Sequence, residues 1–164
     1  MNRLNLLFLI IITMAVYRPL AAQNKALAVI DFKSLAPKLQ ASGDSLKIVN
    51  FWATWCRPCV EELKYFKLAA DTFSSQKVKF IFVSLDFKSQ KEKVEQFWAK
   101  NKIKGSIYLL EDDPNKWINQ IDSSWTGEIP YTLIIPSNSK SSKVNGELKN
   151  YTELQSLINN NLTK

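Results

Sequence analysis

Alternating blocks of apolar and mixed residues organise this chain. Short runs rich in β-branched and aromatic residues predict buried strands, because they lack helical periodicity and are only about four to eight residues long. Between them, apolar residues recur three or four positions apart, as is typical of helices that cover a sheet. The expected strands are 46–52, 78–85, 107–110 and 131–135, with edge strands at 27–32 and 140–144 and a short helix at 34–40.

The other helical segments follow the strands in turn. Asp113 and Pro114 suit the N-cap and the first position of one helix. Thr152 and Gln155 have the spacing of a capping box at the start of the last helix. The apolar positions of these helices are Leu63, Phe66, Ala70 and Phe73, then Val94, Phe97 and Trp98, then Trp117, Ile118 and Ile121, and finally Leu154, Leu157 and Ile158. Strands that alternate with helices predict an α/β fold around a largely parallel sheet.

Residues 1–22 have a different composition from the rest. Arg3 precedes an apolar run at 6–16, and the small residues Ala21 and Ala22 follow. This pattern predicts a cleaved secretory signal peptide, because a membrane-spanning helix needs about 18 or more apolar residues. If it were left uncleaved, the same segment would anchor the protein in a membrane. We therefore expect an exported, periplasmic protein.

Residues 23–164 form the expected mature protein, and their length suits a single domain with its own core. The whole chain carries 22 lysines and arginines against 15 acidic residues, a net charge of +7. The basic residues alternate with acids, as in Lys91, Glu92, Lys93 and Glu95, and form no stripe. This pattern is typical of a solvated surface and argues against nucleic-acid binding.

The two cysteines of the chain, Cys56 and Cys59, lie in the segment FWATWCRPCVEEL, between an expected strand and an expected helix. A structural zinc site needs about four ligands, and a chain with two cysteines and no histidine cannot supply a closed site of this kind. A purely structural disulfide is also unfavourable, because closing so short a loop removes little entropy from the unfolded chain. We favour the interpretation that the pair is a reactive dithiol.

The expected start of the helix distinguishes the two thiols. A helix that begins at Cys56 or Arg57, with Pro58 in its first turn, directs its unpaired N–H groups toward the Cys56 sulfur. These groups and the Arg57 cation favour the thiolate, so Cys56 is the predicted nucleophile. Cys59 is the predicted resolving thiol, which attacks the mixed disulfide formed by Cys56 and releases the partner.

The segment VNFWATWCRPCVEEL, residues 49–63, resembles the thioredoxin superfamily, and most closely its exported TlpA-like and ResA-like thiol-disulfide oxidoreductases. A second segment, WTGEIPYTLII at 125–135, resembles the Gly-x-x-Pro segment of the same family. The resemblance covers about residues 46–158. It implies a thioredoxin fold, which is a central mixed sheet flanked by helices, with the TlpA-like inserted helix and strand at 89–110.

The resemblance also implies roles for single residues. Pro130 aligns with the cis-proline of the family, which faces the dithiol, and Ile129 presents its backbone to the substrate. Glu62 matches an acidic residue that helps to move protons as the disulfide opens; the alternative is a solvated glutamate that complements the helix dipole. Asn50 replaces the buried aspartate of cytoplasmic thioredoxins, which makes Glu62 its substitute. The expected substrate-binding residues are Trp55, Arg57, Pro58, Ile129 and Pro130.

The family activity is exchange of disulfides with exported proteins that carry thiols or disulfides. We expect the reducing direction, with re-reduction by a membrane electron-donor protein, in service of cytochrome c maturation or another envelope thiol pathway. The alternatives are a disulfide oxidase or isomerase, a thioredoxin-fold peroxidase and a non-catalytic binding module. The sequence shows no haem, flavin, nucleotide or metal motif, so we expect no cofactor, and a monomer is the default.

Overall fold

The computed structural model describes residues 27–40, 43–137 and 140–162. The predicted signal peptide lies outside these residues. Each described helix is too short or too polar to cross a membrane. The elements in chain order are β1 (Ala28–Ile30), α2 (Phe32–Leu39), β2 (Leu46–Trp52), α3 (Arg57–Thr72), β3 (Val78–Ser84), the 3-10 turn η1 (Lys88–Gln90), α4 (Lys91–Asn101), β4 (Ser106–Leu110), α5 (Pro114–Ile121), β5 (Tyr131–Ile135), β6 (Ser142–Asn145) and α6 (Tyr151–Leu162).

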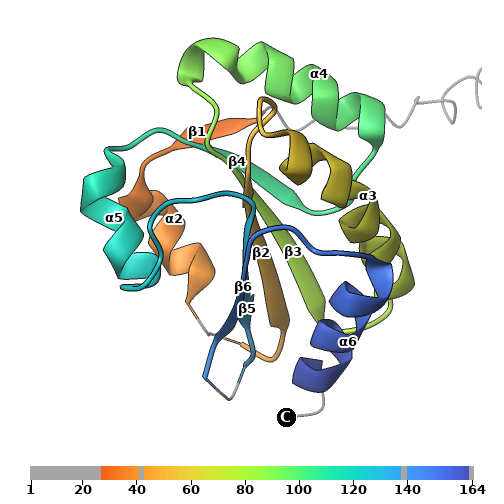
Figure 1. Cartoon of the computed structure of the whole chain (residues 1–164). Coiled ribbons are helices and arrows are strands. Elements are labelled where there is room, and N and C mark those ends of the chain that lie inside the picture. The colour runs from red at the N-terminus through yellow and green to blue at the C-terminus, as the bar shows by residue number, and fades with distance from the viewer. Residues whose placement is uncertain (1–26, 41–42, 138–139, 163–164) are drawn as a thin grey trace, which may run out of the picture.

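The strands form one mixed sheet in the order β1-β4-β3-β2-β5-β6 (Figure 1). The pairs β1–β4, β4–β3 and β3–β2 are parallel, whereas β5 runs antiparallel to both β2 and β6. Every residue of β2 is buried, as its nearly continuous apolar sequence predicts for a central strand. The predicted α/β fold with a mixed sheet is confirmed.

Helices cover both faces of the sheet, with α3 and α6 on one face and α2 and α5 on the other (Figure 1). Phe66 of α3 and Leu154 of α6 pack into one core cluster. Phe32 of α2 and Trp117 of α5 pack into a second cluster on the opposite face. Because successive residues of a strand point to opposite faces, β2 supplies side chains to both clusters and fixes the two layers relative to each other.

The inserted helix and strand expected at 89–110 are α4 and β4. The strand β4 pairs with both β3 and β1, so the insertion lies inside the sheet. The helix α4 adds Val94 to the core cluster on the side of α3. The insertion therefore adds a strand to the sheet beside β3. Because β4 is parallel to β3, it ends at the same edge of the sheet as β3.

Two of the expected boundaries need correction. The strand expected at 27–32 ends at Ile30, because Asp31 caps α2 and accepts a hydrogen bond from the Ser34 N–H at 2.9 Å. The capping box expected at Thr152 and Gln155 is wrong.

The cap of α6 lies two residues earlier. The Asn150 side-chain oxygen Oδ1 accepts from the Glu153 N–H at 3.0 Å, and the Glu153 carboxylate accepts from the Lys149 N–H at 2.8 Å. Asparagine caps helices as well as threonine does, so the sequence offered two starts and the earlier one forms. At α5, by contrast, Asp113 is the cap that the sequence predicts, and it accepts from the Asn115 N–H at 3.1 Å.

Candidate active site

The two cysteines lie where β2 gives way to α3. The strand ends at Trp52, and a tight turn brings the Cys56 N–H to the Ala53 carbonyl oxygen at 3.2 Å. Cys56 is the N-cap of α3, and its sulfur accepts a hydrogen bond from the Cys59 N–H at 3.4 Å. The helix therefore begins where the sequence predicts, with the Cys56 sulfur at its positive end. The two cysteines form a disulfide, and their Cα atoms are 5.3 Å apart.

The two sulfurs differ in their access to solvent. Cys56 retains 7% of its surface, whereas Cys59 is completely buried. Both cysteines are therefore largely buried, but only Cys56 keeps some contact with solvent. This asymmetry agrees with an attacking role for Cys56 and a resolving role for Cys59.

The residues beside the cysteines are more exposed. Trp55 keeps 56% of its surface accessible, as a docking residue requires. Phe51 and Trp52 are buried in the core, as the sequence predicts for a buried strand. Arg57 extends into solvent and forms an ion pair with Glu61 at 2.8 Å, so its charge is shared with that carboxylate. The Arg57 cation therefore supports the Cys56 thiolate less than the sequence suggests.

The loop before β5 faces the dithiol from a distant part of the chain. The peptide bond between Ile129 and Pro130 is cis, as the family resemblance implies. The Ile129 carbonyl oxygen lies 3.8 Å from the Cys56 sulfur. Ile129 is partly exposed and Pro130 is buried, so the backbone of Ile129 borders the sulfur that a substrate must reach.

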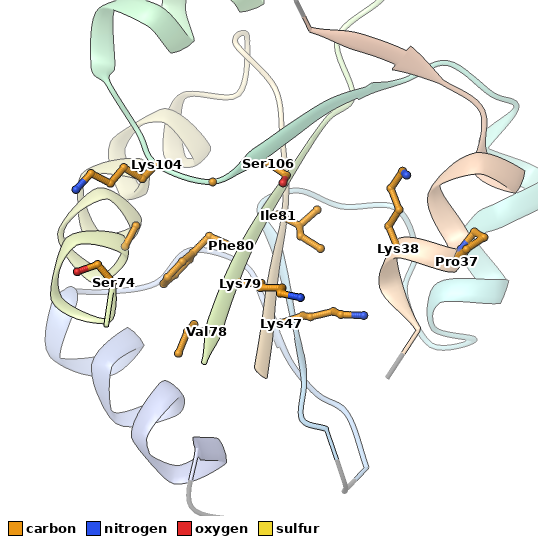
Figure 2. A pocket seen from close by; sticks show the side chains of 12 residues that line it. Pro37, Lys38, Lys47, Ser74, Val78, Lys79, Phe80, Ile81, Lys104 and Ser106 are labelled. Atoms are coloured by element: carbon orange, nitrogen blue, oxygen red, sulfur yellow. The ribbon is translucent and has the colours of Figure 1, made fainter. Parts of the chain in front are cut away.

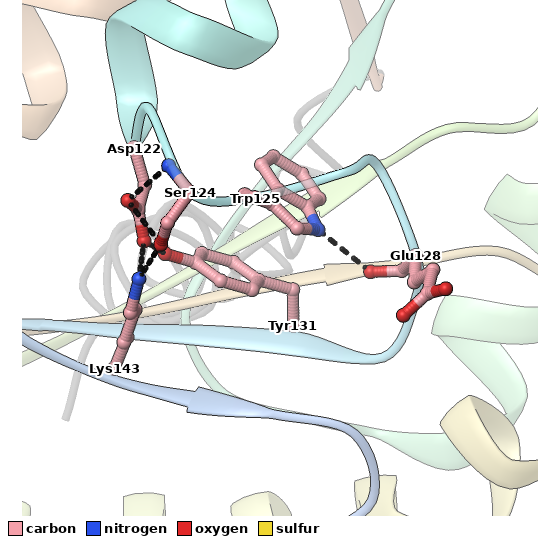
Figure 3. A network of polar contacts seen from close by, with 6 residues as sticks. All are labelled: Asp122, Ser124, Trp125, Glu128, Tyr131 and Lys143. Atoms are coloured by element: carbon pink, nitrogen blue, oxygen red, sulfur yellow. Dashed lines mark hydrogen bonds and ion pairs between the residues drawn. The ribbon is translucent and has the colours of Figure 1, made fainter.

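Two aromatic residues hold this loop at its ends (Figure 3). The Trp125 indole N–H donates to the Glu128 carbonyl oxygen at 2.8 Å. The Trp125 ring stacks on Tyr131, with the ring centroids 4.3 Å apart. These contacts join the first residue of the loop to the first residue of β5, and Ile129 lies between them.

A polar cluster anchors Tyr131 in turn (Figure 3). The Asp122 carboxylate accepts from the Tyr131 hydroxyl at 2.9 Å, from the Ser124 N–H at 2.9 Å and from the Lys143 ammonium. The Lys143 ammonium, together with these donors, holds the pKa of Asp122 well below its usual range. Burial, together with the adjacent carboxylate, raises the pKa of Tyr131 above its usual range. The phenol therefore stays protonated and the carboxylate ionised, which preserves the contact at neutral pH. We call Asp122, Ser124, Trp125, Tyr131 and Lys143 the loop brace.

Glu62 lies inside the core, and the alternative of a solvated glutamate is wrong. Its side chain is fully buried. One carboxylate oxygen accepts from the Asn50 amide at 2.8 Å, and the other accepts from the Leu148 N–H at 2.9 Å. The Asn50 amide also donates to the Thr132 hydroxyl at 3.1 Å. Burial raises the pKa of Glu62 to about 7, because these two donors offset only part of the cost of burying its charge.

Glu62 is also close to Cys59, the predicted resolving residue. Residues three apart on a helix share one face, with Cβ atoms about 5–6 Å apart. Cys59 and Glu62 have this spacing on α3, and both are fully buried. The helix therefore presents a thiol and a carboxyl group that titrates near neutrality to the same interior region.

A second buried carboxylate fixes the loop before Cys56. Asp86 follows β3, and it accepts from the Thr54 N–H at 2.9 Å and from the Thr54 hydroxyl at 2.5 Å. The Ser84 hydroxyl also donates to it at 2.8 Å. We predicted no role for Asp86, although its place directly after a buried strand was a signal available in the sequence. The contact forms because β2 and β3 are parallel neighbours whose carboxyl ends meet at one edge of the sheet.

A basic cavity of about 520 Å³ lies at the opposite end of the strands (Figure 2). The lysines that line it are Lys38, Lys47, Lys79 and Lys104. Lys47 is buried and donates to the Gln40 carbonyl oxygen at the end of α2, and Lys104 pairs with Asp71 at 2.7 Å. The lining contains no cysteine and no residue of the loop brace, so this cavity is separate from the dithiol site.

A dithiol at the N-terminus of a helix, next to a cis-proline loop on a mixed sheet, defines a thioredoxin-like protein. The chain belongs to the AhpC/TSA family, whose model matches residues 22–141. A solved structure of a thiol:disulfide interchange protein of the thioredoxin family, from Chlorobium tepidum, aligns with a TM-score of 0.61 at 24% identity. That alignment covers 73% of this chain and 81% of the other.

Curated relatives have similar sequences over shorter spans. The chain is 27% identical over 96 residues to the thiol-disulfide oxidoreductase ResA of Geobacillus thermodenitrificans. This alignment covers 58% of this chain and 51% of the relative. It is 38% identical over 63 residues to the sporulation thiol-disulfide oxidoreductase A of Bacillus subtilis, and that alignment covers 38% of each chain. The chain thus matches about half, or less, of the length of these two relatives.

Proposed function

We propose that this chain is an exported thiol-disulfide oxidoreductase that reduces disulfides in other exported proteins. The observation that carries the proposal is the pairing of Cys56, which keeps 7% of its surface exposed next to the Ile129 carbonyl oxygen, with a fully buried Cys59 one helical turn away. The names of the curated relatives support the same activity. Export rests on the predicted signal peptide.

The reaction begins at Cys56. In the reduced protein, the Cys56 thiolate attacks one sulfur of a substrate disulfide, which forms a mixed disulfide and releases the first substrate thiolate. That thiolate takes a proton from solvent. The Ile129 backbone lies next to the reacting sulfur and orients the substrate chain against it.

The second step depends on the buried groups. The Cys59 thiol transfers its proton to the Glu62 carboxylate, and the new thiolate attacks the Cys56 sulfur. The Cys56–Cys59 disulfide forms, and the second substrate thiolate leaves with a proton, so two electrons have passed to the substrate. A carboxyl group with a pKa of about 7 accepts and returns a proton efficiently near neutral pH. A membrane electron-donor protein then restores the dithiol.

The electrostatics around Cys56 support the reducing direction. A strongly stabilised thiolate makes a dithiol an oxidant, because it favours the reduced form of the protein. Here the Cys56 sulfur accepts one N–H, that of Cys59 at 3.4 Å, and the Arg57 cation is paired with Glu61. Stabilisation of the thiolate is therefore modest.

Reduction of a model protein disulfide, followed with excess dithiol, tests this proposal. The native chain should accelerate the reaction, and Cys56→Ser should abolish the acceleration. Cys59→Ser should instead accumulate mixed disulfides with substrate proteins, because the resolving thiol is missing. Equal activity of Cys56→Ser and the native chain would overturn the proposal and favour a binding module.

Two further measurements separate the related chemistries. Equilibration with glutathione gives the reduction potential of the Cys56–Cys59 pair. A strongly oxidising potential would identify the protein as a disulfide oxidase rather than a reductase. Peroxide consumption that depends on Cys56 and outpaces disulfide reduction would identify a peroxidase.

A further inference from the structure

A small cavity of about 250 Å³ opens at the carboxyl ends of β3 and β4. Most of its lining is apolar and comes from Leu85, Phe87, Leu110, Pro114, Trp117, Ile118 and Gly127. The other lining residues are the charged Asp86, Lys88, Glu111 and Asp112. These residues come from the segment after β3, the end of β4, the helix α5 and the loop that leads to Pro130. We call this space the apolar cavity. The inserted β4 supplies part of its wall, so the insertion helps to shape it.

Two of the segments that line the apolar cavity also contact the residues around the dithiol. On one side, Gly127 lies two residues before Ile129, whose carbonyl oxygen is 3.8 Å from the Cys56 sulfur. Two residues of extended chain span about 7 Å. On the other side, Asp86 lines the cavity and holds Thr54, which lies two residues before Cys56. A polypeptide joined to Cys56 therefore has its neighbouring residues within reach of the cavity.

The exposed apolar side chains are concentrated at the same place. Among the described residues, the large hydrophobic side chains that remain exposed are Trp55 at 56%, Leu68 at 48% and Phe87 at 75%. Trp55 and Phe87 directly follow Thr54 and Asp86, the two residues that bond to each other. Two of these three side chains thus stand on loops that the Thr54–Asp86 hydrogen bonds join, one loop carrying Cys56 and the other lining the cavity. Apolar groups gathered in this way are typical of interaction sites.

The dimensions of the cavity limit what it can accept. Cavities that hold whole small molecules measure about 300–1,000 Å³. The apolar cavity is smaller, and the Lys88–Glu111 ion pair, at 3.2 Å, lies between residues that line it. It is therefore suited to one apolar side chain with a polar backbone at its mouth.

We propose that the apolar cavity binds an apolar side chain that flanks the reactive cysteine of a polypeptide substrate. The proposal rests on the proposed function, because the mixed disulfide is what places the substrate beside the cavity. Phe87 is then a specificity-determining residue. Substrates with an apolar residue within two positions of the cysteine are preferred over substrates with polar residues there.

Two peptides and one small disulfide test this inference. The peptides carry the same disulfide and differ only in having leucine or serine on both sides of the cysteine, and the small compound is hydroxyethyl disulfide. The native chain should reduce the leucine peptide about 10-fold more efficiently in kcat/KM, because a hydrophobic pocket discriminates by this order of magnitude. Phe87→Ser should cut the preference to less than about twofold, mainly through KM, and leave hydroxyethyl disulfide reduction unchanged.

Leu68→Ser is the matched control, because Leu68 is also an exposed apolar side chain but lies on α3 and does not line the cavity. It should preserve the preference for the leucine peptide. Equal use of both peptides by the native chain, or equal loss of preference in the two serine variants, would overturn the inference. In either case reduction of hydroxyethyl disulfide would leave the proposed function standing, whereas failure to reduce any disulfide would overturn the proposed function itself.

Discussion

The pKa values of two carboxylates, Glu62 on α3 and Asp122 in the loop brace, are shifted in opposite directions. Glu62 is fully buried with two N–H donors, and burial raises its pKa to about 7. Asp122 accepts from a lysine ammonium, a tyrosine hydroxyl and the amide and hydroxyl of Ser124, and the pKa of its carboxyl group is lowered. Burial of Glu62 and the cationic donor at Asp122 therefore decide which carboxylate titrates near neutral pH. The first carboxyl group is suited to proton transfer, and the second to holding the loop brace together.

The largest predicted difference concerns catalysis. Glu62→Gln should slow disulfide reduction on the order of 10²-fold, because the Cys59 thiol loses its proton acceptor. The rate of the native chain should rise with pH through an apparent pKa near 7, and the variant should lose this step. Steady-state kinetics between about pH 5 and 9 measure both effects.

Glu61→Gln is the control for this experiment. Glu61 is the exposed neighbour of Glu62, and its recorded partner is Arg57. Its loss should change the rate by less than about twofold. If the two glutamine variants behave alike, Glu62 has no role in proton transfer.

The same carboxyl group should make stability depend on pH. Between the unfolded pKa of 4.5 and the folded pKa of about 7, the native state holds a proton that the unfolded state has lost. The contribution of Glu62 to stability is therefore greatest below about pH 4.5, falls as the pH rises toward 7 and levels off above it, a loss of about 3 kcal/mol in total. Urea unfolding at a series of pH values should show this decline, and Glu62→Gln should flatten it. A decline that persists in the variant would contradict the assignment.

The smallest effect is predicted for the loop brace. Tyr131→Phe removes the hydroxyl that donates to Asp122 and should lower the free energy of unfolding by about 1 kcal/mol. This loss should be the same at pH 6 and 8, because the phenol stays protonated and Asp122 ionised across that range. Disulfide reduction should change by less than about threefold. Paired unfolding curves and rates provide the measurement.

Acid should weaken the brace through its carboxylate. The pKa of Asp122 is depressed in the folded state, so its contribution to stability is present above the unfolded pKa of 3.8 and is lost as the pH falls below it. The native chain should therefore be more stable than Asp122→Asn near neutral pH, and this difference in the free energy of unfolding should shrink as the pH is lowered toward about 3. A gap that stays constant would show that the Asp122 charge contributes nothing.

Much of this site was predictable from local sequence. The Cys-x-x-Cys pair between a strand and a helix located the dithiol, and the family resemblance supplied the cis bond before Pro130. The surroundings of Glu62 were not predictable, because its partners come from distant segments. Asn50 is 12 residues away in the sequence, and Leu148 is 86. A glutamate in the second turn of a helix has the same local sequence whether it faces solvent or the core.

Hydrophobic periodicity and turn residues by themselves determined the order of strands and helices and the start of α3 at the cysteines, and the family resemblance identified α4 and β4 as an insertion. These features depend on neighbours within a few positions, which a single sequence displays directly. Only the tertiary structure decided that Glu62 is buried, that Asp86 holds Thr54 and that Phe87 borders a cavity beside the dithiol. Each of these depends on which strands lie side by side, because pairing across the sheet sets the dielectric surroundings, the donors and the exposed surface of residues far apart in the chain.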